Sequence, residues 1–269
     1  MRALLIVNPH ATSTTRLRRD VIARALASAV ELEIVETRYR GHGTSLAADA
    51  ASAGYGLVIT LGGDGTVNEA INGLLRPPRA PAAVPARHPV PDAPEPAPPT
   101  LAALPGGSAN VFARALGLPP DPVDATGHVL SALAAGRFRS IGLGLADDRY
   151  FTFNSGMGLD AEVVRAVEGR RAHGRSVSPA LYMRMAGRQF WRLTDRHTPA
   201  MHLGCPGPDG PDGPEGPEGP GREDCPDGPA DSSPLFWCTV SNTSPWTYVG
   251  RHPVQTNPEA SFDAGLDVF

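Results

Sequence analysis

The feature that most constrains the fold occurs twice in the first half of the chain: an apolar run, a glycine-rich turn and a helical pattern, in that order. The first copy spans residues 57–75, with its turn at Gly62–Thr66. The second copy spans residues 101–116, with its turn at Pro105–Ser108. An apolar run that ends at glycines and passes directly into a helical pattern indicates a buried strand followed by a helix.

Two more strands are predicted upstream, at residues 3–7 and 32–35, and helical patterns follow them at 17–30 and 45–52. Strands that alternate with helices at this spacing indicate a parallel sheet with helices packed on its faces. We therefore predict the α/β fold class, with a three-layer domain at the N-terminus.

The second half of the chain has a different pattern. Strands are predicted at 138–145, 150–154, 201–203 and 235–240, with one helix at 179–193. Mainly antiparallel strands with few helices indicate a separate α+β domain. We place the boundary near residue 138, which gives domains 1–137 and 138–269.

Glycine and proline are abundant, 30 and 29 of 269 residues, because two inserts contain many of them. Residues 77–100 hold ten prolines, and residues 204–233 hold eight glycines and eight prolines. In the second insert glycine recurs at every third position from 204 to 219, but this acidic stretch is too short for a collagen helix. We predict that both inserts are disordered loops.

The composition excludes several kinds of site. All 24 basic residues are arginine, so the chain has no P-loop or Schiff-base lysine, and any bound phosphate must meet backbone amides, arginine or a metal. The net charge of −4 argues against nucleic-acid binding. No apolar stretch reaches the ~18 residues of a membrane span. Three cysteines without a signal peptide indicate a reducing, cytoplasmic setting.

Each glycine-rich turn is expected to place a helix N-terminus at the end of a strand. Thr66 and Glu69 have the spacing of a capping box, and Ser108 is the expected N-cap of the second helix. Free amides and the helix dipole at such an end attract phosphate, and two turns on neighbouring strands form a cradle. The alternative is that each turn is only a tight connection between a strand and a helix.

Asp64 lies inside the first of these turns. A carboxylate in an anion-attracting turn repels phosphate unless it holds Mg²⁺ or accepts a proton, so Asp64 is a candidate metal ligand and catalytic residue. The alternative is an Asx turn, a common use of aspartate beside glycine.

Together these motifs resemble the diacylglycerol kinase catalytic-domain family of bacterial lipid kinases. NAD kinases and phosphofructokinases share the Gly-Gly-Asp-Gly turn, whereas the second turn and the helix after it are similar to lipid kinases in particular. The segments that carry the resemblance are Asn8-Pro9, Gly62–Thr66 with Asn68-Glu69, Pro105–Asn110, Phe112–Gly117, Gly156–Glu162 and Asp263–Asp267.

The resemblance implies an N-terminal nucleotide-binding domain, a C-terminal β-sandwich-like domain, and ATP with Mg²⁺. The acceptor would be a primary hydroxyl of diacylglycerol or a similar lipid. Asp64 would lie at the phosphates, and Asp160 on the acceptor side. The residues that would contact ATP are Asn8, Gly62, Gly63, Gly65, Thr66, Gly106, Gly107, Ser108 and Asn110.

The sequence departs from the family pattern at three places. Val111 stands where an aspartate often follows Asn110, and Ala264 interrupts an Asp-Asp-Gly pattern that can support a second Mg²⁺. The chain also ends at Phe269, before the segment that carries the proposed general base of the family. We expect a lipid kinase, with two alternatives: another Gly-Gly-Asp-Gly kinase such as NAD kinase, and a catalytically inactive nucleotide- or lipid-binding protein.

Arginine recurs at every fourth position in the C-terminal half, at Arg184, Arg188, Arg192 and Arg196. Such a stripe can contact anionic headgroups, with about 1 kcal/mol for each arginine near the surface. The alternative is a solvated face of a helix whose apolar side packs on the domain. We expect a cytoplasmic protein that meets its lipid at the inner membrane surface; the sequence does not predict its oligomeric state.

Overall fold

The computed structural model describes residues 1–75, 97–172, 179–192, 201–202 and 234–269. The chain forms two compact units, one of residues 1–153 and 242–264, the other of residues 154–241 and 265–269. Most of both predicted inserts, 77–100 and 204–233, lies outside the described residues. The predicted domains, 1–137 and 138–269, stay a prediction, because compactness does not test which segment folds independently.

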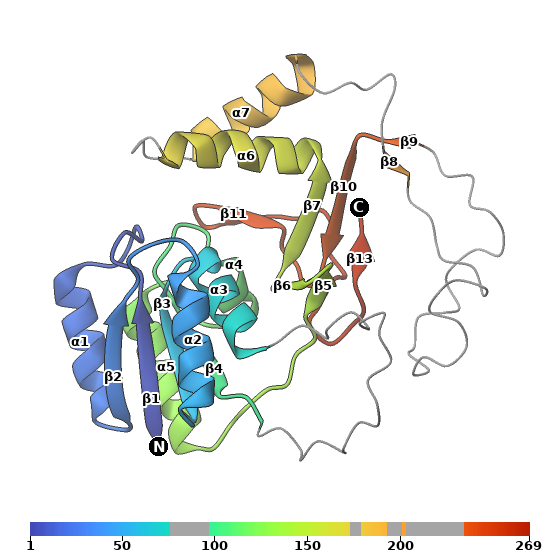
Figure 1. Cartoon of the computed structure of the whole chain (residues 1–269). Helices are drawn as coiled ribbons and strands as arrows, with labels where there is room; N and C mark the ends of the chain where they lie inside the picture. Colours follow the sequence, from blue (N-terminus) through green and yellow to red (C-terminus); the bar gives the residue numbers. More distant parts are fainter. Residues whose placement is uncertain (76–96, 173–178, 193–200, 203–233) are drawn as a thin grey trace, which may run out of the picture. The chain divides into compact units, whose positions relative to one another are not determined.

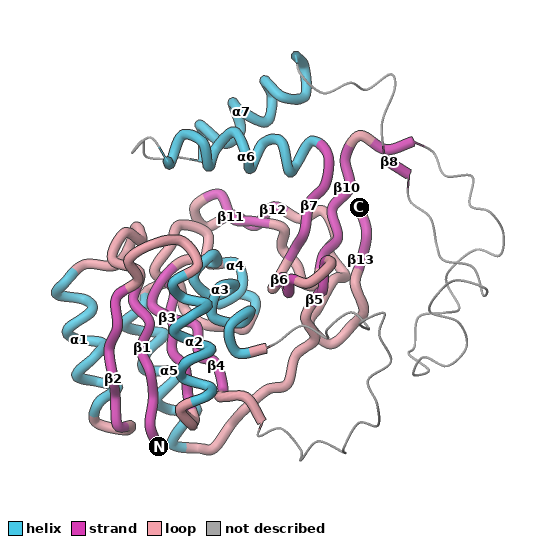
Figure 2. The backbone as a smooth tube through the Cα atoms, viewed as in Figure 1, coloured by secondary structure: helices cyan, strands magenta, loops and turns pink. Residues whose placement is uncertain are grey.

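Four parallel strands form the sheet of the first unit, in the order β2-β1-β3-β4 (Figures 1 and 2). They are β1 (Arg2–Val7), β2 (Glu31–Glu36), β3 (Leu57–Gly62) and β4 (Thr100–Pro105). The two central strands, β1 and β3, are buried along their apolar lengths, and Leu5 pairs with Ile59 between them. Burial on both faces is why these strands occur in the sequence as continuous apolar runs.

Helices cover both faces of this sheet. They are α1 (Arg16–Ala27), α2 (His42–Ser52), α3 (Asp64–Leu74), α4 (Val111–Ala115) and α5 (Pro122–Ala134). Successive residues of β1 point to opposite faces. Leu5 packs with α1 and α5, whereas Ile6 packs with α2 and α3. This three-layer arrangement confirms the predicted α/β class.

Two short antiparallel hairpins complete the first unit: β5 (Gly144–Ala146) with β6 (Arg149–Phe151), and β11 (Thr247–Val249) with β12 (His252–Val254). Asn72 of α3 binds the main chain of Tyr150 in β6 through both ends of its amide, each at 2.9 Å. Arg114 of α4 donates to the carbonyl of Gly250 at 3.3 Å and stacks on the ring of Tyr248. Side chains of two helices thus hold both hairpins.

The second unit has a three-stranded antiparallel sheet, in the order β13-β10-β7. Its elements are β7 (Asn154–Gly158), α6 (Leu159–Ala172), α7 (Pro179–Arg192), β8 (Met201–His202), β9 (Pro234–Leu235), β10 (Trp237–Ser241) and β13 (Asp267–Val268). Val163 and Val167 of α6 pack with Met185 of α7. Antiparallel strands in the C-terminal half are as predicted.

Within the described ranges, the structure contains no helix that is both long and apolar enough to cross a membrane.

Gly73 allows α2 and α3 to lie backbone against backbone, because a Cβ at this position would overlap the carbonyl oxygen of Thr44. We expect Gly73→Ala to lower the free energy of unfolding by about 1–3 kcal/mol, although alanine has the better helix propensity. Gly127→Ala in α5 is the matched control, because a Cβ there meets nothing within 4 Å. This control should raise stability by up to about 1 kcal/mol. Urea unfolding measures both changes, and equal shifts would contradict the close helix contact.

Candidate functional site

In the sheet, β1 is followed in the chain by β2 on one side, whereas β3 is followed by β4 on the opposite side. The direction in which the chain adds strands therefore reverses between β1 and β3. Ligands of open parallel sheets bind at such a switch point, outside the carboxyl ends of the strands. Asn8 follows β1 directly, and the glycine turn Gly62–Thr66 begins at the end of β3. Asn8 Nδ2 donates to Thr66 Oγ1 at 3.3 Å, so the two loops are joined at the switch point.

The second glycine turn lies directly against the first. The amide of Gly106 donates to the carbonyl of Gly62 at 2.7 Å. A Cβ on Gly107 would lie 2.6 Å from the Cα of Gly63, which is too close for any side chain. The loops after β1, β3 and β4 therefore meet at one edge of the sheet, where the sequence places its ATP contacts.

The helices of the first unit differ in how their N-terminal amides are satisfied. Thr15 caps α1, Asp121 caps α5, and Glu69 accepts from amides at the start of α2. By contrast, α3 has Gly63 as its N-cap and no side-chain cap. Gly65, in the first turn of α3, is exposed, and a Cβ there would meet nothing within 4 Å. The N-terminus of α3 is therefore open toward a ligand.

The predicted capping box of Thr66 and Glu69 is wrong, although a helix does begin at this turn. Because α3 starts at Asp64, Thr66 lies inside its first turn. The carboxylate of Glu69 instead accepts from the amides of Gly41 at 2.8 Å and Gly43 at 3.0 Å. The carboxylate of Glu69 thus binds the start of α2, whereas the spacing in the sequence predicted that it would bind the start of α3.

The prediction of Ser108 as the N-cap of the second helix is also wrong, because α4 begins at Val111, after Asn110. Asn110 lies in the left-handed region, with φ 50°, and is buried. Its side-chain oxygen accepts from the amide of Gly107, and its side-chain nitrogen donates to the carbonyl of the same residue, both at 2.8 Å. Asn110 therefore closes the second turn, whereas Ser108 is exposed.

Asp64 is the first residue of α3, and its carboxylate contacts the next helix along the chain. Oδ1 of Asp64 accepts from the amide of Phe112 in α4 at 3.0 Å. Burial raises the pKa of this carboxyl above its ordinary value, against a smaller opposite effect of nearby backbone amides. Among the residues that the structure describes, no group of three or more His, Cys, Asp or Glu could hold a metal ion.

Asp160 belongs to the second unit, where it lies in the first turn of α6. A Cβ on Gly156 would overlap its carboxylate, so the carboxylate lies directly on the main chain of β7. The role of Asp160 on the acceptor side stays a prediction.

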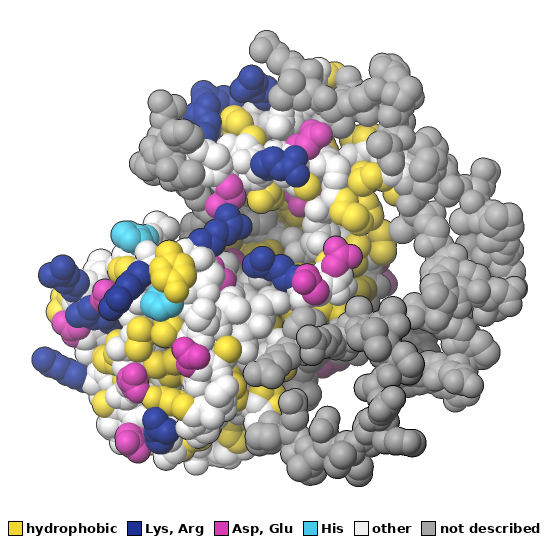
Figure 3. Space-filling model, in the orientation of Figure 1, with side chains coloured by type: hydrophobic (Ala, Val, Ile, Leu, Met, Phe, Trp, Pro, Cys, Tyr) yellow, Lys and Arg dark blue, Asp and Glu magenta, His cyan; other side chains and the backbone are white. Residues whose placement is uncertain are grey.

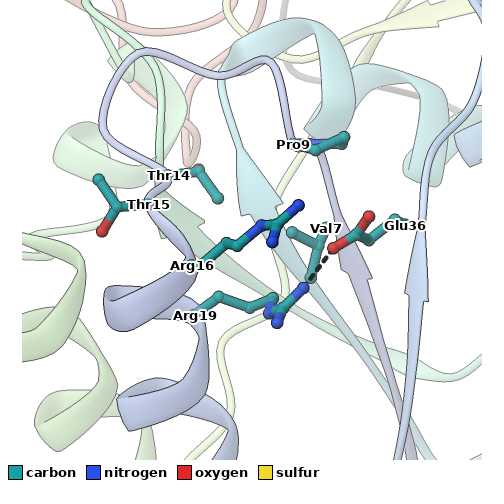
Figure 4. A pocket seen from close by; sticks show the side chains of 7 residues that line it. All are labelled: Val7, Pro9, Thr14, Thr15, Arg16, Arg19 and Glu36. Carbon is teal, nitrogen blue, oxygen red and sulfur yellow. Dashed lines mark hydrogen bonds and ion pairs between the residues drawn. The ribbon is translucent and has the colours of Figure 1, made fainter.

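Sequence reasoning missed a pocket of about 490 Å³ at the N-terminus of α1, beside the ends of β1 and β2 (Figure 4). Arg19 forms ion pairs there with Glu36 and Asp20. Arg16 is exposed and has no ion pair within the described ranges. The lining residues are Val7, Pro9, Thr14, Thr15, Arg16, Arg19 and Glu36. The sequence feature that could have indicated this pocket is the arginine-rich start of α1, because the chain has no lysine.

A parallel sheet whose switch point carries two joined glycine turns and an open helix N-terminus is typical of α/β proteins that bind phosphorylated ligands. The family model of the diacylglycerol kinase catalytic domain matches residues 2–145. The chain belongs to this family.

Individual proteins that are similar in sequence to this chain have names that agree with this family. The diacylglycerol kinase of Bacillus subtilis (strain 168) is 32% identical over 174 residues, which are 63% of this chain and 50% of the relative. A protein of Chromohalobacter salexigens named "Probable lipid kinase YegS-like" is 32% identical over 162 residues, 60% of this chain and 45% of that protein. The chain thus spans about half the length of the curated relatives it matches.

The fold also matches a solved structure. A diacylglycerol kinase from Bacillus anthracis str. Sterne aligns with a TM-score of 0.62 and 24% identity, covering 100% of this chain and 74% of that one. At this identity the match shows the fold.

Proposed function

We propose that the chain is an ATP-dependent lipid kinase, which transfers the γ-phosphoryl group of ATP to the hydroxyl of diacylglycerol and forms phosphatidate. Family membership and the names of the relatives support a lipid kinase. The observation that carries the proposal is the open N-terminus of α3, which lies at the switch point of the sheet and next to the second glycine turn.

The proposed ATP contacts divide into two groups. Gly65 and Ser108 are exposed, so their amides or hydroxyl can meet phosphate oxygens directly. The others shape the loops through the contacts described above, and any contact that they make with the nucleotide is through their main chains. These are Asn8, Gly62, Gly63, Thr66, Gly106, Gly107 and Asn110.

In the reaction, the lipid hydroxyl oxygen bonds to the γ-phosphorus, the bond from that phosphorus to ADP breaks, and the hydroxyl proton leaves to a base. Negative charge spreads over the transferred oxygens, so catalysis depends on fixed hydrogen-bond donors and positive charge. The amide of the exposed residue Gly65 at the start of α3 supplies such a donor, whereas the amides of Thr66 and Val67 bind the carbonyl of Gly63. Because the chain has no lysine, permanent side-chain positive charge comes from arginine, and Arg16 in the pocket beside Pro9 is a candidate.

The sequence predicts Mg²⁺ at Asp64. Protein-bound Mg²⁺ usually takes one or two carboxylates together with phosphate and water oxygens. In this structure Oδ1 of Asp64 accepts from the amide of Phe112, and among the described residues no cluster of three or more His, Cys, Asp or Glu side chains could hold a metal ion. Because the carboxylate serves as an acceptor for a backbone amide here, we derive no step of the reaction through the ion.

Transfer from γ-³²P-ATP tests the proposed reaction. The chain, incubated with diacylglycerol vesicles and Mg²⁺, should form labelled phosphatidate. Label in NADP when NAD replaces the lipid, with none in phosphatidate, would instead identify a NAD kinase. ATP binding without transfer to either acceptor would identify a catalytically inactive nucleotide-binding protein.

Substitution of Gly65 separates ligand binding from packing, because a Cβ there meets nothing in the protein. We expect Gly65→Ala to keep or raise the thermal stability, since alanine favours a helix. The new methyl group should keep phosphate from the α3 amides and weaken ATP binding about tenfold, the effect of one lost charged hydrogen bond. Calorimetric titration with ATP measures this, with Gly127→Ala as the control for a helix glycine away from the site. Unchanged ATP affinity would place the phosphates elsewhere.

We further propose peripheral binding at the inner membrane surface through α7. Arg184 and Arg188 are exposed, and Trp191 is 71% exposed; their spacing puts all three on one helical face. Met185, on another side of the helix, is buried. Figure 3 shows basic and hydrophobic side chains close together over the region of α6 and α7. Of the predicted stripe, the side chain of Arg192 and all of Arg196 lie outside the described residues.

Vesicle flotation tests this surface. The double variant Arg184→Gln/Arg188→Gln should bind anionic vesicles about 25-fold less tightly than the wild type, about fivefold for each arginine. On neutral vesicles the wild type and the variant should bind equally poorly. The control is Arg24→Gln/Arg137→Gln, which removes the same charge from exposed positions of the first unit. Equal losses in both double variants would show a general charge effect and contradict a binding face on α7.

A further inference from the structure

The N-terminus of α4 lacks a local cap. Its N-cap residue, Asn110, makes no side-chain hydrogen bond to the helix, because both ends of its amide are bonded to Gly107. The first amides of a helix have no partner within the helix and need an acceptor from outside it. In α4 this acceptor is the carboxylate of Asp64, which binds the amide of Phe112 at 3.0 Å.

This bond has the geometry of an N-cap, supplied from another part of the chain. Phe112 is the second residue of α4, and an N-cap side chain binds the amide of the second or third helical residue. Asp64 lies 48 residues earlier in the sequence and opens α3. One carboxylate therefore connects the starts of the two helices that follow the two glycine turns.

Both ends of this connection are anchored. Phe112 is buried, and its ring packs edge to face on Phe262 at 5.5 Å between centroids. On the other side, Gly63 immediately precedes Asp64 and touches Gly107 of the second turn. The carboxylate thus lies between two fixed points and determines where α4 starts relative to the two turns, which are themselves in direct contact.

We propose that Asp64 is a positioning residue, which caps α4 and holds the start of that helix beside the two glycine turns in the arrangement that ATP requires, and that it is not a metal ligand. The requirement for ATP rests on the proposed function, whereas the cap itself does not. One of the two carboxylate oxygens, Oδ1, already accepts a backbone amide. Because the N-cap residue Asn110 makes no side-chain bond to α4, loss of the carboxylate removes the side-chain acceptor of the Phe112 amide.

The two substitutions Asp64→Asn and Asp64→Ala separate these roles. Asparagine keeps an oxygen for the amide of Phe112 but loses the charge, whereas alanine loses both. We expect Asp64→Ala to lower the melting temperature by about 2–8 °C and to speed amide hydrogen exchange at Phe112. It should also weaken ATP binding more than about tenfold. Asp64→Asn should recover most of all three properties and leave the Mg²⁺ concentration for half-maximal transfer near that of the wild type.

Asp121 provides the matched control, because its carboxylate caps α5 by accepting from the amide of Val123 at 2.8 Å and, in the part of the chain that the structure describes, makes besides this cap only an exposed ion pair with Arg18 at 3.4 Å. Asp121→Ala should lower the melting temperature, as any lost cap does, and leave ATP affinity unchanged. Equal loss of ATP affinity in Asp121→Ala and Asp64→Ala would overturn the proposal, since the effect would then be one of general stability.

The proposal would also be overturned if Asp64→Asn kept the wild-type melting temperature and Phe112 protection but lost transfer as completely as Asp64→Ala. That result would mean that the charge of Asp64 takes part in the chemistry. If the wild type itself transfers no phosphate, the proposed function fails, and melting temperature, amide exchange and ATP binding still decide the role of Asp64. If Asp64→Ala does not fold, Asp64→Asn alone decides through the same measurements.

Discussion

The first unit depends on the contact between its two glycine turns. The amide of Gly106 binds the carbonyl of Gly62, and Gly107 touches Gly63 without room for a Cβ. This approach continues the pairing of β3 and β4 past the ends of the strands, so the loops after them have one relative position. A backbone-to-backbone contact cannot relax as side chains do, because any added atom must separate the strands or break the hydrogen bond. The open start of α3 is therefore presented in a fixed geometry, which suits the recognition of phosphate.

The short helix α4 connects the first glycine turn to a segment that lies much later in the chain. Asp64 caps its start, and Arg114 near its end binds Gly250 and stacks on Tyr248. Between them, Phe112 packs on Phe262. The five-residue helix α4 thus contacts both the first glycine turn and the segment 242–264. It joins the edge of the sheet to the hairpin of β11 and β12 in one packed structure.

The sequence predicted the elements better than the contacts between them. The strands at 3–7 and 57–61 were found because burial on both faces leaves an unmistakable apolar run, and the glycines marked the helix starts. The caps were predicted wrongly because the i, i+3 spacing identifies local partners only. Glu69 binds the start of a different helix, and Asp64 caps a helix 48 residues away. The same limit applies to the site: a glycine needed for packing, such as Gly107, and one open to a ligand, such as Gly65, look alike in sequence.

The discontinuity of the first unit has a consequence for its synthesis. The residues that close the core around α4, including Phe262, are translated only after the entire stretch 154–241. While that stretch emerges from the ribosome, the cluster of Phe112, Val67 and Ile71 lacks the packing of Phe262. The two glycine turns can form early from local strands, but their support from the late hairpin comes last. The nascent protein thus passes through a stage in which the edge with the glycine turns lacks part of its packing, and incompletely packed apolar surface of this kind favours chaperone binding or aggregation.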